Sequence, residues 1–142
     1  MKVRDVMSRS VIRINPEENL AVAARTLEHY NIGSLPVCGR DGYLCGILTD
    51  RDIVTRCLAA GRSAQNTSVR DVMTRQVISA NPDMDIGVAA HLMGRQQIRR
   101  LPVLENGKLC GMVSLGDLAQ REESVIDAAD ALADIISNVS PR

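Results

Sequence analysis

Aromatic side chains are almost absent from this sequence. It contains no Trp, no Phe and only two Tyr, Tyr30 and Tyr43. Proteins that bind single-stranded nucleic acid commonly stack bases on aromatic rings, and nucleic-acid-binding surfaces commonly carry a surplus of Lys and Arg. Here 17 basic residues are balanced by 17 acidic ones. We therefore expect no nucleic-acid partner, and a hydrophobic core built from aliphatic side chains.

Long apolar runs are also missing. No stretch approaches the roughly 20 apolar residues that span a bilayer, and the first residues, Met-Lys-Val-Arg-Asp, lack the apolar region of a signal peptide. The four cysteines form no Cys-x-x-Cys pair, and there are only two histidines, which disfavours a structural zinc site. We expect a cytoplasmic protein in a reducing compartment, with no membrane association and no metal.

One sequence unit occurs twice. The matching segments are Val-Arg-Asp-Val-Met at 3–7 and 69–73, Asn-Pro at 15–16 and 81–82, Leu-Pro-Val at 35–37 and 101–103, and, after a one-residue deletion, Leu-Cys-Gly at 44–46 and 109–111. Matches in this order indicate an internal duplication. We predict repeats at 1–60 and 69–120, a polar linker at 61–68, and a C-terminal helix and tail at 121–142.

Both repeats predict the same order of elements, β-α-β-β-α. A short β-branched run ends at Asn-Pro, a helical apolar pattern follows, and two strands with a Gly-containing turn precede a second helix. The expected strands are 11–14, 34–38, 44–49, 77–80, 100–104 and 109–114, and the expected helices begin near Leu20, Asp50, Ile86 and Leu115. The fold class is α/β (α+β). We expect the two repeats to pack about a pseudo-twofold axis, with ligand clefts between them.

The C-terminal region, residues 119–138, predicts an otherwise acidic helix with one apolar stripe. The stripe comprises Val125, Ala128, Ala129, Leu132, Ile135 and Ile136. Two roles stay open for it: the helix covers the module, or it contacts a partner.

The most informative motifs are Thr49-x-x-Asp52 and Ser114-x-x-Asp117, each at the end of a predicted strand. A hydroxyl at a helix start can donate to phosphate, and an Asp one turn later can accept both hydroxyls of a ribose. The same spacing is typical of a helix capping box that needs no ligand. Either interpretation fits one motif; their duplication favours ligand binding.

Arg99 and Arg100 form the second signal. They lie where a helix passes into a strand, and guanidinium groups suit phosphate, although a solvated basic pair is an equally good interpretation. The first repeat has Gly33 and Ser34 there. The two repeats are therefore not expected to bind one ligand equally well.

These doubled motifs closely resemble a tandem pair of CBS (cystathionine β-synthase) domains, a Bateman module, over residues 1 to about 120. The resemblance implies a regulatory, non-enzymatic module that binds AMP, ADP, ATP or S-adenosylmethionine and requires no cofactor. It also implies a homodimer that signals in trans to an unidentified protein. By resemblance, Asp52 and Asp117 hold ribose hydroxyls, Thr49 and Ser114 approach phosphate, and Arg99 and Arg100 contact phosphate. The residues implied for adenine are Val11, Ile12, Ile32, Val77, Ile78 and Ile98.

The sequence offers three alternatives to this function. Catalysis is disfavoured because Cys45 and Cys110 lie in strands, while neither His falls at an equivalent place in the two repeats. Cys38 and Cys45 flank one hairpin, which leaves a redox-responsive module open. A ligand-free dimerisation module that uses the C-terminal helix is the remaining alternative.

Overall fold

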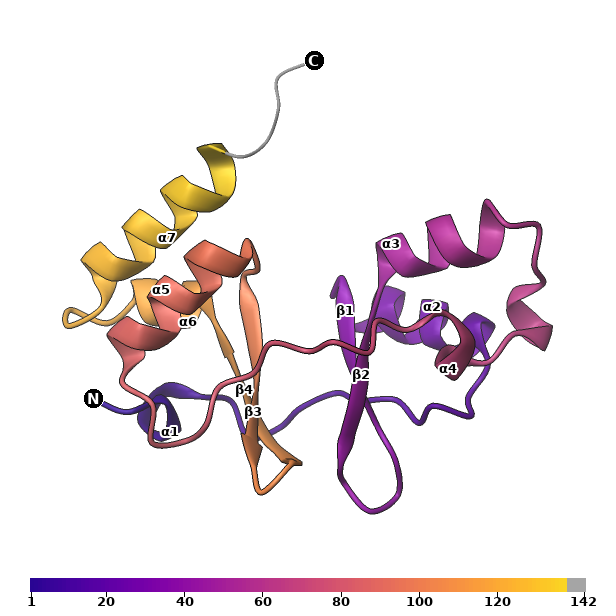
Figure 1. The fold of residues 1–142 in the computed structure, drawn as a ribbon, viewed down its shortest axis with the longest axis horizontal. Helices are drawn as coiled ribbons and strands as arrows, with labels where there is room; N and C mark the ends of the chain where they lie inside the picture. The colour runs from indigo at the N-terminus through magenta and orange to yellow at the C-terminus, as the bar shows by residue number, and fades with distance from the viewer. Residues whose placement is uncertain (138–142) are drawn as a thin grey trace. The chain divides into compact units, whose positions relative to one another are not determined.

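The computed structural model describes residues 1–137, which form two compact units (Figure 1). Unit 1 comprises Met1–Val11 and the chain from Ile78 onward, and unit 2 comprises Ile12–Val77. These units divide the chain at other points than the sequence repeats do. Each unit takes its Val-Arg-Asp-Val-Met segment from the other repeat.

Unit 2 contains α2 (Leu20–Tyr30), the hairpin β1 (Ser34–Cys38) and β2 (Leu44–Thr49), and α3 (Asp50–Ile53). A π-helical segment, Val54–Leu58, continues α3, and a 3-10 turn at Ala64–Asn66 leads to α4 (Val69–Val72). The predicted helix starts and hairpin are confirmed, and the polar linker contains the 3-10 turn.

Unit 1 repeats this order with α5 (Ile86–Gln96), β3 (Arg100–Glu105), β4 (Lys108–Ser114) and α6 (Leu115–Ala119). The N-terminal helix α1 (Val3–Val6) and the C-terminal helix α7 (Val125–Ser137) belong to the same unit. None of the helices described within residues 1–137 combines the length and apolarity needed to cross a bilayer.

The predicted strands at 11–14 and 77–80 are each reduced to a single parallel bridge, Ile14 to Val37 and Ala80 to Val103. Ile14 N donates to Pro36 O at 3.0 Å, and Cys38 N donates to Ile14 O at 3.0 Å. The next ladder bonds would need N–H groups from Pro16 and Pro36, which proline lacks. Pro82 and Pro102 interrupt the unit 1 ladder in the same way. The prolines that mark the repeats therefore also shorten their first strands.

The Val-Arg-Asp-Val-Met segments dock by equivalent contacts. Val3 N donates to Met84 O at 2.8 Å, and Val69 N donates to Glu18 O at 2.8 Å. Each segment also forms an ion pair, Arg4 with Asp83 and Arg70 with Glu17. The valines of α1 and α4 are buried, so each short helix completes the core of its unit.

Gly46 and Gly111 allow the chain after each docked helix to lie against the hairpin. A Cβ on Gly111 would lie 2.5 Å from Met7 Sδ and 3.0 Å from Ser8 O, and a Cβ on Gly46 would lie 2.8 Å from Thr74 O. Ser8 and Thr74 form antiparallel bridges to β4 and β2 at these places. The Leu-Cys-Gly motif therefore marks a close backbone approach.

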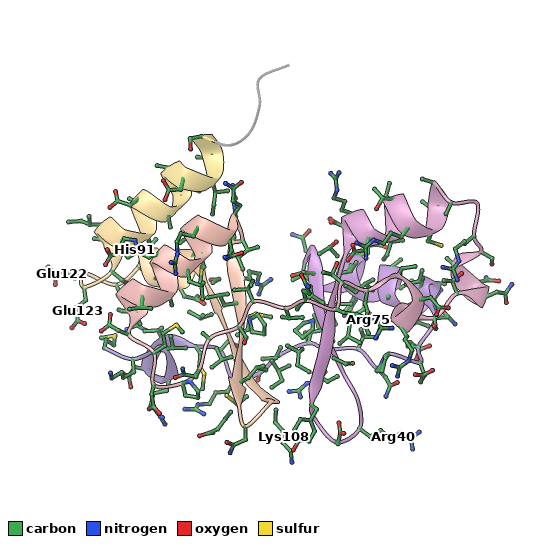
Figure 2. All side chains as sticks on the ribbon, in the orientation of Figure 1. Arg40, Arg75, His91, Lys108, Glu122 and Glu123 are labelled. Carbon is green, nitrogen blue, oxygen red and sulfur yellow. The ribbon has the colours of Figure 1, made fainter. Side chains whose placement is uncertain are left out.

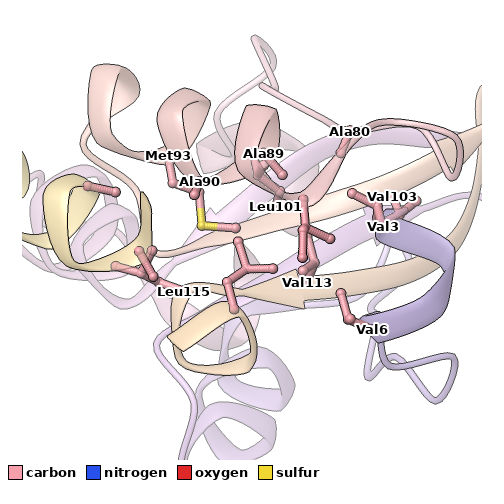
Figure 3. Close-up of a cluster of buried hydrophobic side chains, with 14 residues drawn as sticks. Val3, Val6, Ala80, Ala89, Ala90, Met93, Leu101, Val103, Val113 and Leu115 are labelled. Atoms are coloured by element: carbon pink, nitrogen blue, oxygen red, sulfur yellow. The ribbon is translucent and has the colours of Figure 1, made fainter. Parts of the chain in front are cut away.

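The unit 1 core packs α5 against the β3–β4 hairpin (Figure 3). Its labelled members are Val3, Val6, Ala80, Ala89, Ala90, Met93, Leu101, Val103, Val113 and Leu115. All of them are aliphatic, as the shortage of aromatic residues predicts.

Helix α7 packs on α5 through Ala128 and Ala131, which are buried. The helix predicted at 119–138 is shorter in the described chain, because Ala119 ends α6 and α7 begins at Val125. Position 138 lies outside the described residues. The predicted apolar stripe is buried along one edge, at Ala128 and in part at Ile135, whereas Val125, Leu132 and Ile136 remain exposed.

Candidate functional site

The two strand-to-helix junctions are complete capping boxes. In unit 2, Asp52 N donates to Thr49 Oγ1 at 3.1 Å, and Thr49 N donates to Asp52 Oδ2 at 2.9 Å. In unit 1, the corresponding distances between Ser114 and Asp117 are 3.1 Å and 3.0 Å. The capping interpretation is therefore confirmed in both repeats. Capping occupies one oxygen of each carboxylate and leaves the other available for a different contact.

The second oxygen of Asp52 is already engaged. Thr74 Oγ1 donates to Asp52 Oδ1 at 3.4 Å, and Arg56 Nε lies 3.8 Å from the same oxygen. The Arg56 guanidinium also donates to the carbonyls of Val72 and Met73 at 3.1 and 3.3 Å. Only 7% of the Asp52 surface is exposed. This carboxylate therefore joins α3 to the segment that follows α4.

Asp117 lies in a more open setting. It is half-buried, and within residues 1–137 its carboxylate accepts a hydrogen bond only from Ser114 N. Ser8 stands where unit 2 has Thr74, but its hydroxyl donates to Ser10 O at 3.3 Å. Arg121 stands where unit 2 has Arg56, and its side chain forms no ion pair with the described chain. Asp117 thus keeps one carboxylate oxygen available.

The strand entrances differ in charge. Leu115 N donates to Arg99 O at 2.8 Å, and Asp50 N donates to Gly33 O at 3.0 Å, so Arg99 and Gly33 are structurally equivalent. Both Arg99 and Arg100 are exposed, and neither forms an ion pair with any described residue. In unit 2 the Asp50 carboxylate lies 3.4 Å from where a Gly33 Cβ would be. Unit 1 is therefore cationic at this position, whereas unit 2 is anionic.

A pocket of about 580 Å³ adjoins the Arg99–Arg100 pair in unit 1. The residues that line it are Arg99, Arg100, Ser114, Leu115, Gly116, Ala119, Val125, Ala128, Ala129 and Leu132. Its volume lies within the range typical of small-molecule sites, about 300–1,000 Å³. Three predicted site residues thus meet at one pocket. The sequence reasoning missed the wall from α7, although the predicted stripe already named Val125, Ala129 and Leu132.

The six residues implied for adenine are divided between the units. Val11, Ile78 and Ile98 belong to unit 1, while Ile12, Ile32 and Val77 belong to unit 2. Ile78 is 37% exposed, and the other five are half-buried. None of them is among the residues that line the unit 1 pocket. Their contact with adenine, like the predicted clefts between repeats, stays a prediction.

The cysteines are free thiols held inside the units. Cys38 is 3% exposed, and burial raises the pKa of its thiol. Cys45 Sγ donates to Val37 O at 3.2 Å. A buried thiol with a raised pKa forms little thiolate, which disfavours the redox alternative. Within residues 1–137, no three His, Cys, Asp or Glu side chains are placed to hold a metal ion.

Comparisons with known proteins agree with this geometry. The model of the CBS domain family matches residues 3–59 and 69–124. The CBS domain-containing protein YhcV of Bacillus subtilis is 41% identical over 133 residues, which covers 94% of either chain. Hypoxic Response Protein I, solved with two coordinated zinc ions, aligns with a TM-score of 0.78 and 33% identity over 85% of this chain and 98% of its own.

The CBS domain pair of protein MJ0100 was solved in complex with 5′-methylthioadenosine and S-adenosyl-L-methionine. It aligns with a TM-score of 0.73 and 29% identity, over 84% of this chain and 94% of its own. Both the doubled match to the family and the doubled capping boxes fall on the two halves of the internal repeat. The chain therefore belongs to the CBS domain family and carries two CBS domains in tandem.

Proposed function

We propose that this CBS pair is a regulatory module that binds an adenine nucleotide, AMP, ADP or ATP, through unit 1. The observation that carries the proposal is the open Asp117 carboxylate in the same unit as the Arg99–Arg100 pair and the pocket beside Ser114. Asp117 accepts ribose hydroxyls, Ser114 donates to phosphate, and the two guanidiniums neutralise the phosphate charge. The adenosine ligands of MJ0100 support the class of ligand.

Unit 1 is favoured over unit 2 as the nucleotide site because the Asp117 carboxylate has an oxygen available, whereas both oxygens of Asp52 are engaged. A ribose that bound Asp52 would have to displace Thr74 and Arg56 from its Oδ1. A phosphate near Gly33 would meet the Asp50 carboxylate instead of a guanidinium. Like charges at such short range are unfavourable. Thr49 and Asp52 therefore serve mainly to cap α3.

The Arg99–Arg100 pair also favours a nucleotide over S-adenosylmethionine. That ligand has one carboxylate against a sulfonium and an ammonium group, so its net charge is positive and is repelled by two guanidiniums that form no ion pair within residues 1–137. An adenine nucleotide presents phosphate oxygens, which match guanidinium donors in both charge and geometry. We therefore place AMP, ADP and ATP ahead of S-adenosylmethionine and the uncharged 5′-methylthioadenosine.

Isothermal titration calorimetry of the full chain tests this proposal. AMP, ADP and ATP are titrated alongside adenosine and S-adenosylmethionine, first into the unaltered protein and then into Arg100→Ala. Arg95→Ala is the matched control, because Arg95 is an exposed arginine of α5 that does not line the pocket. Arg100→Ala should weaken nucleotides about tenfold and adenosine little. Equal losses in both arginine variants, or no binding of any adenosine ligand by the unaltered protein, would contradict the proposal.

We propose a regulatory rather than a catalytic output. The Cys45 and Cys110 thiols donate to strand carbonyls, and His91 pairs with Asp127, so these groups do not form a nucleophile with its base. A homodimer that signals in trans to a regulated protein is part of the proposal. Ligand shifts such a module between two arrangements only by its difference in affinity for them. Sedimentation velocity with and without ADP tests the dimer.

Ligand-free dimerisation is the second candidate function. It is favoured by the exposed apolar side chains of α7, among which Ile126 and Ile136 are 74% and 56% exposed. A chain that dimerises through α7 would lose its dimer on Ile126→Asp. It would also bind no adenosine ligand, so the calorimetry above separates the two functions.

A further inference from the structure

Helix α7 is an integral part of unit 1. It lies alongside α5 (Figure 1), where Ala131 Cα would be 3.0 Å from a Cβ placed on Gly94. His91 of α5 (Figure 2) pairs with Asp127 of α7 at 3.0 Å. Before α7, the buried Ser124 hydroxyl donates to Leu118 O at 2.7 Å. These contacts hold α7 against the CBS domain and thereby fix the direction in which its remaining side chains point.

The side of α7 next to its packed face forms a wall of the unit 1 pocket, and the buried Ala128 belongs to both. Val125, Ala129 and Leu132 occur at i, i+4 and i+7, a helical spacing that places them on one side of α7. Val125 is 43% exposed and Leu132 is 37% exposed, so both side chains can accept a further packing partner. Arg99, Arg100 and Ser114 line the same pocket. Apolar and cationic groups therefore face one space.

The distribution of charge on α7 supports this role. The helix carries Asp127, Asp130 and Asp134 and no basic residue. None of these three aspartates is among the pocket-lining residues, so the side chains that α7 contributes to the lining are all apolar. An anion held by Arg99 and Arg100 would therefore meet no carboxylate on this wall. Such a site suits a ligand with one apolar, flat portion and one anionic portion.

We propose that α7 completes the nucleotide site of unit 1, with Val125, Ala129 and Leu132 packed against the nucleoside while Arg99 and Arg100 hold its phosphate. This inference rests on the proposed function and adds residues outside the CBS repeats to the site. It makes α7 the element that distinguishes a nucleotide from free phosphate. It also makes the position of α7 sensitive to whether the pocket is occupied.

A pair of substitutions with the same charge tests the wall. Ala129 and Ala133 are both exposed alanines of α7, but only Ala129 lines the pocket. Ala129→Glu places a carboxylate opposite the arginines, whereas Ala133→Glu changes net charge and helix composition equally without entering the pocket. Titration calorimetry with ADP should show at least about tenfold weaker binding for Ala129→Glu and a change within about twofold for Ala133→Glu. Equal affinities in the two variants would overturn the role of α7.

A second pair locates the base. Leu132 and Ile126 are both exposed apolar residues of α7, but only Leu132 lines the pocket. Leu132→Ala should weaken ADP binding and leave inorganic phosphate binding unchanged, while Ile126→Ala should bind ADP as the unaltered protein does. Equal ADP affinities in the two variants would refute the α7 wall.

The outcomes also separate this inference from the function on which it rests. If the unaltered chain binds no adenosine ligand, both fail together. If it binds ADP and loses affinity on Asp117→Ala, but Ala129→Glu and Ala133→Glu behave alike, then only the role of α7 fails. Because all substituted α7 positions are exposed, urea midpoints should stay close to that of the unaltered chain.

Discussion

Replacing the two capping aspartates should separate stability from ligand binding. Asp52→Ala removes the acceptor of Thr49 N, of the Thr74 hydroxyl and of the Arg56 guanidinium. Loss of the cap costs about 1 kcal/mol, and the Thr74 and Arg56 contacts add about 1–2 kcal/mol, reduced because Arg56 is 51% exposed. We expect Asp52→Ala to lower the free energy of unfolding by about 2–3 kcal/mol.

Asp117→Ala removes the cap alone, because no other described residue donates to this carboxylate. The expected loss of stability is about 1 kcal/mol. The effect on nucleotide affinity should be larger for Asp117→Ala than for Asp52→Ala. Asp117→Ala removes a ribose acceptor worth about 1–3 kcal/mol, or roughly 5- to 150-fold in affinity. Asp52→Ala should leave nucleotide affinity unchanged.

Urea denaturation and titration calorimetry with ADP measure the two effects on the same protein samples. The difference between the two variants, rather than either value, tests whether Thr74 and Arg56 stabilise unit 2 through Asp52. Equal destabilisation would mean that the contacts of Thr74 and Arg56 with Asp52 contribute nothing. Loss of ADP binding in Asp52→Ala but not in Asp117→Ala would assign the ligand to unit 2 and refute the proposed site.

Three further predictions concern packing and thiol chemistry. Gly111→Ala should lower the free energy of unfolding by about 1–3 kcal/mol, because its Cβ would lie 2.5 Å from Met7 Sδ. Gly116→Ala is the control and should not destabilise the protein, because the nearest atom to its Cβ would be 3.8 Å away. Equal urea midpoints for the two variants would contradict the close approach at Gly111. Gly94→Ala should displace α7, and the displacement should appear as faster amide hydrogen exchange in that helix. Unchanged exchange would show that α7 accommodates the added methyl group without moving. Cys38 should react with iodoacetamide at about pH 8 far more slowly in the native chain than in urea, since burial raises the pKa of its thiol; similar rates by mass spectrometry would speak against that burial.

Much of this fold could be predicted because its signals are local. The helix starts at Leu20, Asp50, Ile86 and Leu115 agree with the structure, and so do the two hairpins. The capping boxes could also be predicted, because a hydroxyl residue three positions before an Asp can exchange hydrogen bonds with it at a helix start. Spacing along the chain is sufficient for features of this kind.

The exchange of α1 and α4 between the repeats is a long-range feature that no local pattern reports. It depends on which core buries Val3 and Val69, and both cores are aliphatic. The shortened first strands did leave a signal, because Pro36 and Pro102 remove the N–H groups of a longer ladder. Proline limits the ladder in this way only when Pro36 and Pro102 belong to the partner strand. Sequence alone could not supply that pairing.

The apolar stripe of α7 shows a different limit of periodicity. Apolar residues at 3.6-residue spacing predict a buried stripe, but they do not distinguish positions that pack in the core from positions that border a pocket. Small residues gave the better clue, because the fully buried positions of α7 are alanines, Ala128 and Ala131, and Ala131 lies against Gly94 of α5. The larger Val125 and Leu132 remain exposed.

The duplicated capping boxes explain why capping and ligand binding need not be alternatives. A carboxylate has two oxygens, and the cap uses one of them. In unit 2 the second oxygen is taken by Thr74 and Arg56, which turns Asp52 into a structural link. In unit 1 the same geometry leaves one oxygen of Asp117 open, in a unit whose two arginines form no ion pair within residues 1–137. After duplication, one copy could therefore stabilise the module while the other kept its acceptor for a ligand, without change to the backbone that holds either aspartate.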